Sequence, residues 1–154
     1  MVSGEAQRAV ATRDEEKALL VSIHSRYARL ILSGEKRVEL RRRFDSEAAG
    51  SRMLIYATLP TAAVIGHVVI DHVECLSTDE IWHRYGKDAA ISAEDFRSYF
   101  AGVEGGCAVV LSSPKTYKEP VPLHDLRRTH GLTAPQSYIF LRDAHRELIE
   151  HGQD

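Results

Sequence analysis

The chain is poor in the residue types that define several specialised classes of protein. Its 154 residues include only two cysteines, Cys75 and Cys107, which lie far apart and have no paired spacing. Disulfide-rich scaffolds and zinc-binding modules need several cysteines at short, regular intervals, so the count supports neither class. We expect both cysteines to be buried free thiols, because unpaired cysteine is among the most buried residue types.

Neither sign of charge dominates the chain. The 20 lysines and arginines are balanced by 22 aspartates and glutamates, which gives a formal net charge of −2 and a pI near 6.4. Proteins that coat polyanions gain most of their affinity from a global excess of cationic side chains, which is absent here. Any contact with nucleic acid must therefore depend on a local basic cluster.

Long apolar runs are also missing. No run approaches the roughly 20 residues that a membrane-spanning helix needs, and the N-terminus has no signal-like apolar segment. We therefore expect a cytoplasmic protein without membrane contact. Residues 1–17 are polar and predict a flexible tail, whereas residues 18–150 have the length and apolar content of one folded domain.

The first half of the domain alternates strand and helix patterns. A short apolar run at residues 19–23 predicts a strand, and a helix is expected to open at Ser25 and to end at Gly34. Residues 37–44 alternate between apolar and charged side chains, as a half-buried strand does. Two further strands are expected at residues 53–59 and 62–75, and Gly66 would permit a bend or bulge in the second.

The second half contains two capped helices and a proline-rich arm. Ser77 and Ser92 each precede an acidic residue by three positions, which predicts helix starts. The helical spacing of Trp82, Phe96 and their aromatic neighbours favours packing over base stacking. Three prolines exclude a helix and a central strand over residues 113–122 and leave an edge strand or a loop. The remaining predicted elements are a strand at 107–112, a helical turn at 123–129, a closing strand at 135–141 and a terminal helix at 143–150.

Basic side chains concentrate in one ten-residue stretch. Residues 34–43 read Gly-Glu-Lys-Arg-Val-Glu-Leu-Arg-Arg-Arg and hold five of the 20 lysines and arginines behind the expected helix end. A lysine, a carboxylate and an arginine at a helix-to-strand junction suit the binding of a phosphate or a polarised carbonyl. The alternative is an ordinary solvated pair of Glu39 and Arg41, worth about 0 to 1 kcal/mol.

This stretch has the form G-x-K-x-x-E-x-R and resembles the motif of the ASCH domain family, a branch of the PUA-like β-barrels. Residues 55–60 and the segment Pro135-Gln136-Ser137-Tyr138 are similar to the longer members of that family. The resemblance covers about residues 19–141. It implies an α+β fold, in which helices pack around a small, strongly curved β-barrel, and a cleft between barrel and helices that binds RNA or a modified nucleotide.

The resemblance and the residue chemistry together define a candidate site. Lys36 and the arginines would hold phosphate or ribose, Glu39 would accept from a base or orient Arg41, and the amide and hydroxyl of the late segment would read a base edge. The predicted ligand-binding residues are Lys36, Arg37, Glu39, Arg41, Arg43, Tyr56, Gln136 and Ser137. Tyrosine at position 56 is suited to stacking a base but is more often a core residue. His24 is suited to acid–base chemistry, although a capping or structural role is favoured over it. The histidine spacings give no metal site, and no cofactor is expected.

Three functions follow, in order of preference. The first is binding of RNA or a modified nucleotide. The second is hydrolysis of single-stranded RNA or of an acylated nucleoside, with Lys36 and Glu39 as catalytic residues. Relatives that deacetylate acetylcytidine carry a threonine three residues after the motif lysine, where this chain has Glu39, which argues against that reaction. The third is a protein-interaction module in transcription regulation.

Overall fold

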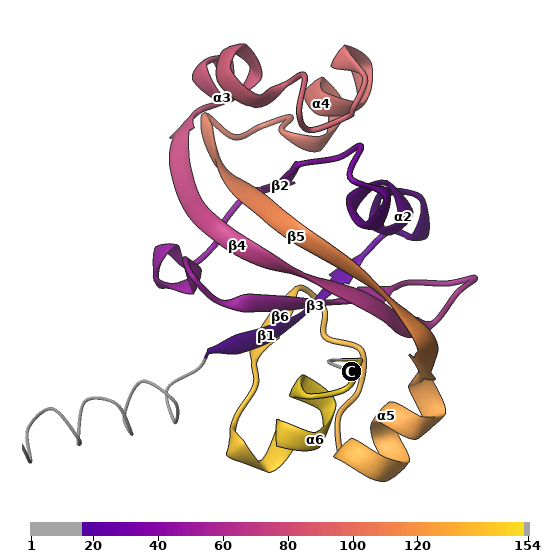
Figure 1. Cartoon of the computed structure of the whole chain (residues 1–154). Coiled ribbons are helices and arrows are strands. Elements are labelled where there is room, and N and C mark those ends of the chain that lie inside the picture. Colours follow the sequence, from indigo (N-terminus) through magenta and orange to yellow (C-terminus); the bar gives the residue numbers. More distant parts are fainter. Residues whose placement is uncertain (1–16, 153–154) are drawn as a thin grey trace, which may run out of the picture.

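The structure is a computed structural model that describes residues 17–152 and consists of one mixed sheet surrounded by short helices (Figure 1). Sixteen residues of the predicted N-terminal tail, 1–16, lie outside the described residues. The strands are β1 (Ala18–Ile23), β2 (Val38–Arg41), β3 (Arg52–Ala57), β4 (Ala63–Ser77), β5 (Gly105–Pro122) and β6 (Tyr138–Phe140). The helices are α2 (Ser25–Ser33), α3 (Thr78–Tyr85), α4 (Ala93–Tyr99), α5 (Leu123–His130) and α6 (Arg146–Ile149), with 3-10 turns η1 (Ser46–Ala48) and η2 (Asp143–His145).

The six strands follow the order β2-β5-β4-β3-β1-β6. Only β1 and β3 pair in parallel, and the connection between them carries α2 and β2. The register of β4 against β5 shifts between Val64 and Gly66, which confirms the bulge predicted there. None of the helices described between residues 17 and 152 has the length and apolar character to cross a membrane.

The sheet does not close into the predicted barrel. β2 and β6 occupy its two ends and form no ladder with each other within residues 17–152. Both strands are short, with four and three residues, so they offer little backbone for a closing ladder. Side chains cross the gap instead, since the rings of Phe44 and Tyr138 lie with their centroids 4.6 Å apart. We call this gap between β2 and β6 the seam.

The proline-rich arm forms the second half of β5 and belongs to the sheet. As far as Val110, β5 pairs with β2 on one side and β4 on the other. Beyond Ser112 it pairs with β4 alone and so becomes an edge. An edge strand tolerates proline because one row of its amides needs no partner. The predicted edge is therefore confirmed, but as part of an 18-residue strand.

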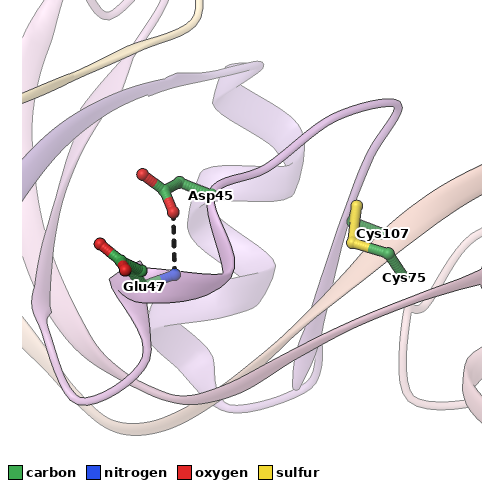
Figure 2. Close-up of a disulfide and its surroundings, with 4 residues drawn as sticks. All are labelled: Asp45, Glu47, Cys75 and Cys107. Atoms are coloured by element: carbon green, nitrogen blue, oxygen red, sulfur yellow. Dashed lines mark hydrogen bonds between the residues drawn. A yellow bond between two sulfur atoms is a disulfide. The ribbon is translucent and has the colours of Figure 1, made fainter.

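The two cysteines form a disulfide, and the prediction of free thiols is wrong. Cys75 on β4 and Cys107 on β5 are direct register partners, with Cα atoms 4.0 Å apart. Figure 2 shows the bond beside turn η1, where the Asp45 carboxylate accepts from the Glu47 amide at 2.8 Å. The separation of 32 residues conceals this proximity because β5 runs back along β4 after α3 and α4. The disulfide therefore joins the two ends of residues 78–104, which we call the α3–α4 insert.

Three apolar clusters hold the elements together. Alternate residues of β3 divide between two of them, with Met53 and Ile55 on one face and Leu54 and Tyr56 on the other. The third cluster packs Phe96 of the insert, with residues from α3, against Val38 and Leu40 of β2 and a residue of β5. This third cluster fixes the insert above the basic stretch, so the sequence motif and the insert share one region of the molecule.

Candidate functional site

A cavity of about 660 Å³ opens between α2, β2 and the α3–α4 insert. Its walls combine the N-terminal turn of α2, the charged residues of β2 and one face of α4. The lining residues are Ser22, Ile23, His24, Arg26, Tyr27, Lys36, Glu39, Leu40, Arg41, Arg42, Ile91, Asp95, Ser98 and Tyr99. Its volume is in the range typical of ligand sites, so we take it as the candidate functional site.

Lys36 lies in the turn before β2 and is only 3% exposed. Its Nζ donates to the Ala89 carbonyl of the insert at 2.5 Å and lies 3.9 Å from Glu39 Oε1. The same atom is 4.8 Å from the centroid of the Tyr27 ring. Burial lowers the pKa of Lys36, the Glu39 carboxylate opposes that shift, and the Arg41 charge adds to it. Lys36 is therefore a buried amine whose charge depends on Glu39.

Glu39 and Arg41 form a buried ion pair. Arg41 Nε donates to Glu39 Oε2 at 3.1 Å, and both side chains are almost fully enclosed. Arg41 also donates from Nη2 to the Ser22 carbonyl on β1 at 2.8 Å and from Nη1 to Ser137 Oγ at 3.4 Å. A single guanidinium thus connects the β2 side of the seam to β1 and to the residue before β6. This enclosure rules out the alternative of an ordinary solvated pair.

The other predicted binding residues are dispersed. Arg37 is exposed and lines a separate hollow with Gly34 and Pro114, and Arg43 is exposed just beyond the end of β2. Tyr56 is 4% exposed and packs in the cluster on one face of β3. Gln136 is exposed next to Ser137 and is not among the residues that line the cavity. The structure therefore brings Lys36, Glu39, Arg41 and Ser137 together, and the roles predicted for all eight residues stay predictions.

His24 caps a helix and also borders the cavity. It is the N-cap of α2, and its Nδ1 accepts from the Arg26 amide at 3.3 Å. The structure therefore shows the capping role, and it places the same residue among those that line the candidate site.

Sequence reasoning missed two tyrosines of the cavity wall. The Tyr27 ring has the Arg26 guanidinium 4.7 Å from its centroid, in addition to Lys36 Nζ on the cavity floor. Tyr99 accepts two hydrogen bonds at its carbonyl from Arg42, at 2.6 and 2.9 Å, and its ring lies 5.5 Å from that guanidinium. Their helical spacing resembles that of core residues, so the sequence carried no signal that separates a cavity wall from packing.

The cavity floor favours an anion. Lys36 and Arg41 are largely enclosed and outnumber the one carboxylate between them, Glu39, and cations held in a sparsely hydrated site act strongly on a ligand charge. Within residues 17–152, no group of three or more histidine, cysteine, aspartate or glutamate side chains is arranged to hold a metal ion. The arrangement can neutralise a phosphate and place the Glu39 carboxylate beside it.

Comparison with known proteins identifies the family of the chain. The family model described as "ASCH domain" matches residues 21–118, which include the whole basic stretch. A curated relative from Zymomonas mobilis, described as an ASCH domain-containing ribonuclease, is 33% identical over 129 residues, or 83% of this chain and 86% of its own length.

Solved structures show the same fold. The crystal structure of ASCH from Zymomonas mobilis has a TM-score of 0.82 at 32% identity and covers 88% of this chain and 96% of its own. The N-terminal domain of Staphylothermus marinus McrB has a TM-score of 0.57 at 16% identity, covering 86% and 92% of the two chains, which indicates a shared fold alone. From the match over residues 21–118 and the Zymomonas relative, the chain belongs to the ASCH domain family.

Proposed function

We propose that this protein is a ribonuclease that cleaves single-stranded RNA in the cavity between α2, β2 and the α3–α4 insert. The observation that carries the proposal is the buried Lys36–Glu39–Arg41 chain on a cationic cavity floor. The Zymomonas relative, described as a ribonuclease, supports the choice of RNA as substrate. Hydrolysis of RNA was the second function drawn from the sequence, and it now ranks above binding alone.

The side chains suit cleavage by the neighbouring ribose hydroxyl. Glu39 takes the proton of the 2′-hydroxyl while the 2′-oxygen attacks the adjacent phosphorus. The bond from phosphorus to the 5′-oxygen breaks, and that oxygen takes a proton from water. The products are a 2′,3′-cyclic phosphate and a 5′-hydroxyl. Lys36 and Arg41 balance the negative charge that builds on the phosphate oxygens in the transition state.

The shape of the site suits an unpaired strand. The cavity is walled by two helices and a strand, and Lys36 and Glu39 at its floor are buried. Bases in an RNA duplex are stacked and paired inside the helix, so only a single-stranded segment can insert a nucleotide here. Tyr99 on the wall gives such a nucleotide an aromatic contact.

Binding without cleavage is the second candidate, and one contact favours it. Lys36 donates to the Ala89 carbonyl, so part of its hydrogen-bonding capacity fixes the insert and is unavailable to substrate. In that case Lys36 would shape the cavity and the charged floor would hold RNA or a modified nucleotide intact. Cleavage of an acylated nucleoside ranks lower, since Glu39 occupies the position of the threonine in the deacetylating relatives.

A cleavage assay on end-labelled single-stranded RNA tests the proposal. Glu39→Gln is expected to slow cleavage about 100- to 10,000-fold, the usual range for loss of a general base. Lys36→Ala is expected to slow it about 100- to 1,000-fold, the usual range for loss of one group that stabilises the transition-state charge. Lys118→Ala removes an equivalent charge from the far half of β5 and is the matched control. A DNA strand of the same sequence lacks the 2′-hydroxyl and should stay intact.

Two results would contradict the ribonuclease proposal. One is parent protein that binds RNA but leaves it uncut during long incubation, which would favour binding alone. The other is Lys36→Ala protein, shown to be folded by its thermal melt, that cleaves as fast as the parent.

A further inference from the structure

A second hollow lies beside the candidate site on the α3–α4 insert. It has a volume of about 630 Å³ and is lined chiefly by Trp82, His83, Gly86 and Lys87, with Ile91 at one side. Ile91 also lines the cavity of the candidate site. The two hollows are therefore neighbours that share a wall, and a chain leaving the cavity past Ile91 would enter the second hollow.

Trp82 presents a fixed aromatic surface to this hollow. Its side chain belongs to α3 and is supported by the Phe96 ring of α4, with centroids 4.9 Å apart and planes at 55°. Phe96 is buried, whereas Trp82 remains 36% exposed. An indole held by a buried ring and open to solvent is a surface on which a base can stack with little loss of side-chain entropy.

Gly86 leaves room against the indole. Its φ is −54° in the right-handed helical region, which any residue adopts, so backbone conformation does not require glycine here. A Cβ at this position would lie 2.8 Å from Trp82 Cε3 and 2.9 Å from Cδ2, closer than real Cβ contacts allow. Any side chain at position 86 would therefore press on the ring that the hollow exposes.

Two exposed side chains that can carry positive charge line the same hollow. Lys87 and His83 line the hollow, and both are exposed. Arg84 lies on the same short helix, although it is paired with Glu74 at 3.1 Å. An exposed aromatic ring beside an unburied lysine is the combination that binds single-stranded nucleic acid, since the ring stacks a base and the cation contacts the backbone phosphate.

We propose that this hollow is a second nucleotide subsite, in which Trp82 stacks the base next to the nucleotide held in the cavity and Lys87 contacts the intervening phosphate. The inference rests on the proposed function, because it takes RNA as the ligand of the adjoining cavity. In addition to the reacting nucleotide, the protein would bind the adjacent one, so its ligand is a strand of at least two nucleotides.

Trp82 is the only tryptophan of the chain, and its fluorescence therefore reports on this subsite directly. The probes are uncleavable 2′-O-methyl oligoribonucleotides of one to six residues. Total binding is followed by the anisotropy of a dye on the RNA, and occupancy of the hollow by quenching of Trp82. Quenching is expected with the longer oligonucleotides and to be absent with the mononucleotide, which occupies the cavity alone.

Variants separate the two contacts. Trp82→Ala should weaken binding of the hexanucleotide about 5- to 150-fold, the effect of losing one stacked base, and should leave mononucleotide binding unchanged. Trp82→Phe keeps a ring against Phe96 and should recover part of the affinity. Lys87→Ala should reduce the slope of log affinity against log salt by about 0.7, whereas Lys118→Ala should not.

The outcomes distinguish failure of the subsite from failure of the proposed function. The subsite is overturned if the hexanucleotide binds by anisotropy while Trp82 fluorescence and the affinity of Trp82→Ala stay at parental values. Equal quenching by the mononucleotide and the hexanucleotide would also overturn it, since the hollow would then act as an independent site. If no oligonucleotide binds by anisotropy, the RNA function itself fails, and the subsite fails with it.

Discussion

Two buried basic side chains in different parts of the molecule invite comparison. Lys36 precedes β2 and bonds to Ala89 of the α3–α4 insert, and His67 lies on β4 against Tyr117 of β5. They are 3% and 8% exposed, and burial lowers the pKa of both. Lys36 has a carboxylate 3.9 Å away and lines an open cavity, whereas the contact of His67 Nδ1 is the neutral Tyr117 hydroxyl at 3.0 Å.

The difference separates a buried charge beside a cavity from a buried neutral group in the core. The Arg52 and Lys115 charges add to burial and bring the pKa of His67 to about 4, so its ring is neutral at pH 7 and serves packing. Glu39 opposes the same effect at Lys36 and favours its charged form. A buried amine with a counter-charge and an opening can act on a ligand, whereas a buried imidazole without either cannot.

The largest expected effect concerns the disulfide. It joins the two ends of the α3–α4 insert, which contacts Lys36. Replacing both Cys75 and Cys107 with serine should lower the free energy of unfolding by about 3–4 kcal/mol, because the crosslink closes a loop of 32 residues. Urea titration of the oxidised parent and the double variant measures the change. Identical midpoints for the two proteins would show that the closed loop adds nothing to stability. Parent protein kept in reductant should match the variant.

Because of His67, the free energy of unfolding should fall at acidic pH. Its pKa is about 4 in the folded protein against 6.5 unfolded, so the unfolded chain binds the extra proton and stability falls as pH drops from about 6.5 to 4. His67→Gln should remove about 1–3 kcal/mol of that loss. The measurement is chemical denaturation of the parent and of His67→Gln at pH 7 and pH 4.5. The loss of stability between the two pH values is compared for the two proteins, and the difference is the contribution of His67.

The cleavage rate of the same variant sharpens the contrast with Lys36. His67→Gln is expected to cut RNA within twofold of the parent at pH 7, because the imidazole does not line the cavity. A large loss of cleavage in folded His67→Gln would break the division between structural and functional buried groups.

The smallest effect concerns the exposed pair at the cavity mouth. Arg26 Nη2 lies 3.6 Å from Asp95 Oδ2, and both side chains are more than half exposed, so the pair links α2 to α4 weakly. A double-mutant cycle with alanine at each position should give a coupling below about 1 kcal/mol. Raising salt to about 1 M, where the Debye length is near 3 Å, should abolish it. A coupling that persists in salt would mean that the pair acts as a fixed part of the wall.

The motif was predictable because its information is local. A helix end at Gly34 followed by an alternating strand placed Lys36 in the turn before β2, where Lys36 Nζ faces Glu39 across 3.9 Å. The disulfide and the full length of β5 could not be predicted from local sequence patterns. Both depend on how β4 and β5 align over a long sequence separation. The open sheet was not predicted either. The family resemblance implied a closed barrel, whereas the short strands β2 and β6 leave a seam between them.

Side-chain exposure was the other limit. Helical spacing assigns an aromatic residue to a face but does not say whether another element covers it. Phe96 and Trp82 have the same pattern in sequence, yet one is 6% exposed and the other 36%. Tyr27 on α2 and Tyr99 on α4 line one cavity because the chain brings these two helices together. Local sequence patterns do not predict that contact.

The Arg41 side chain links the two ends of the sheet and also lines the cavity. Its guanidinium joins β2 to the Ser22 carbonyl and to Ser137 across the seam, and the same group faces the cavity. A phosphate bound to these N–H groups would compete with their contacts to Ser22 and Ser137. Ligand binding would then weaken the link between the two ends of the sheet.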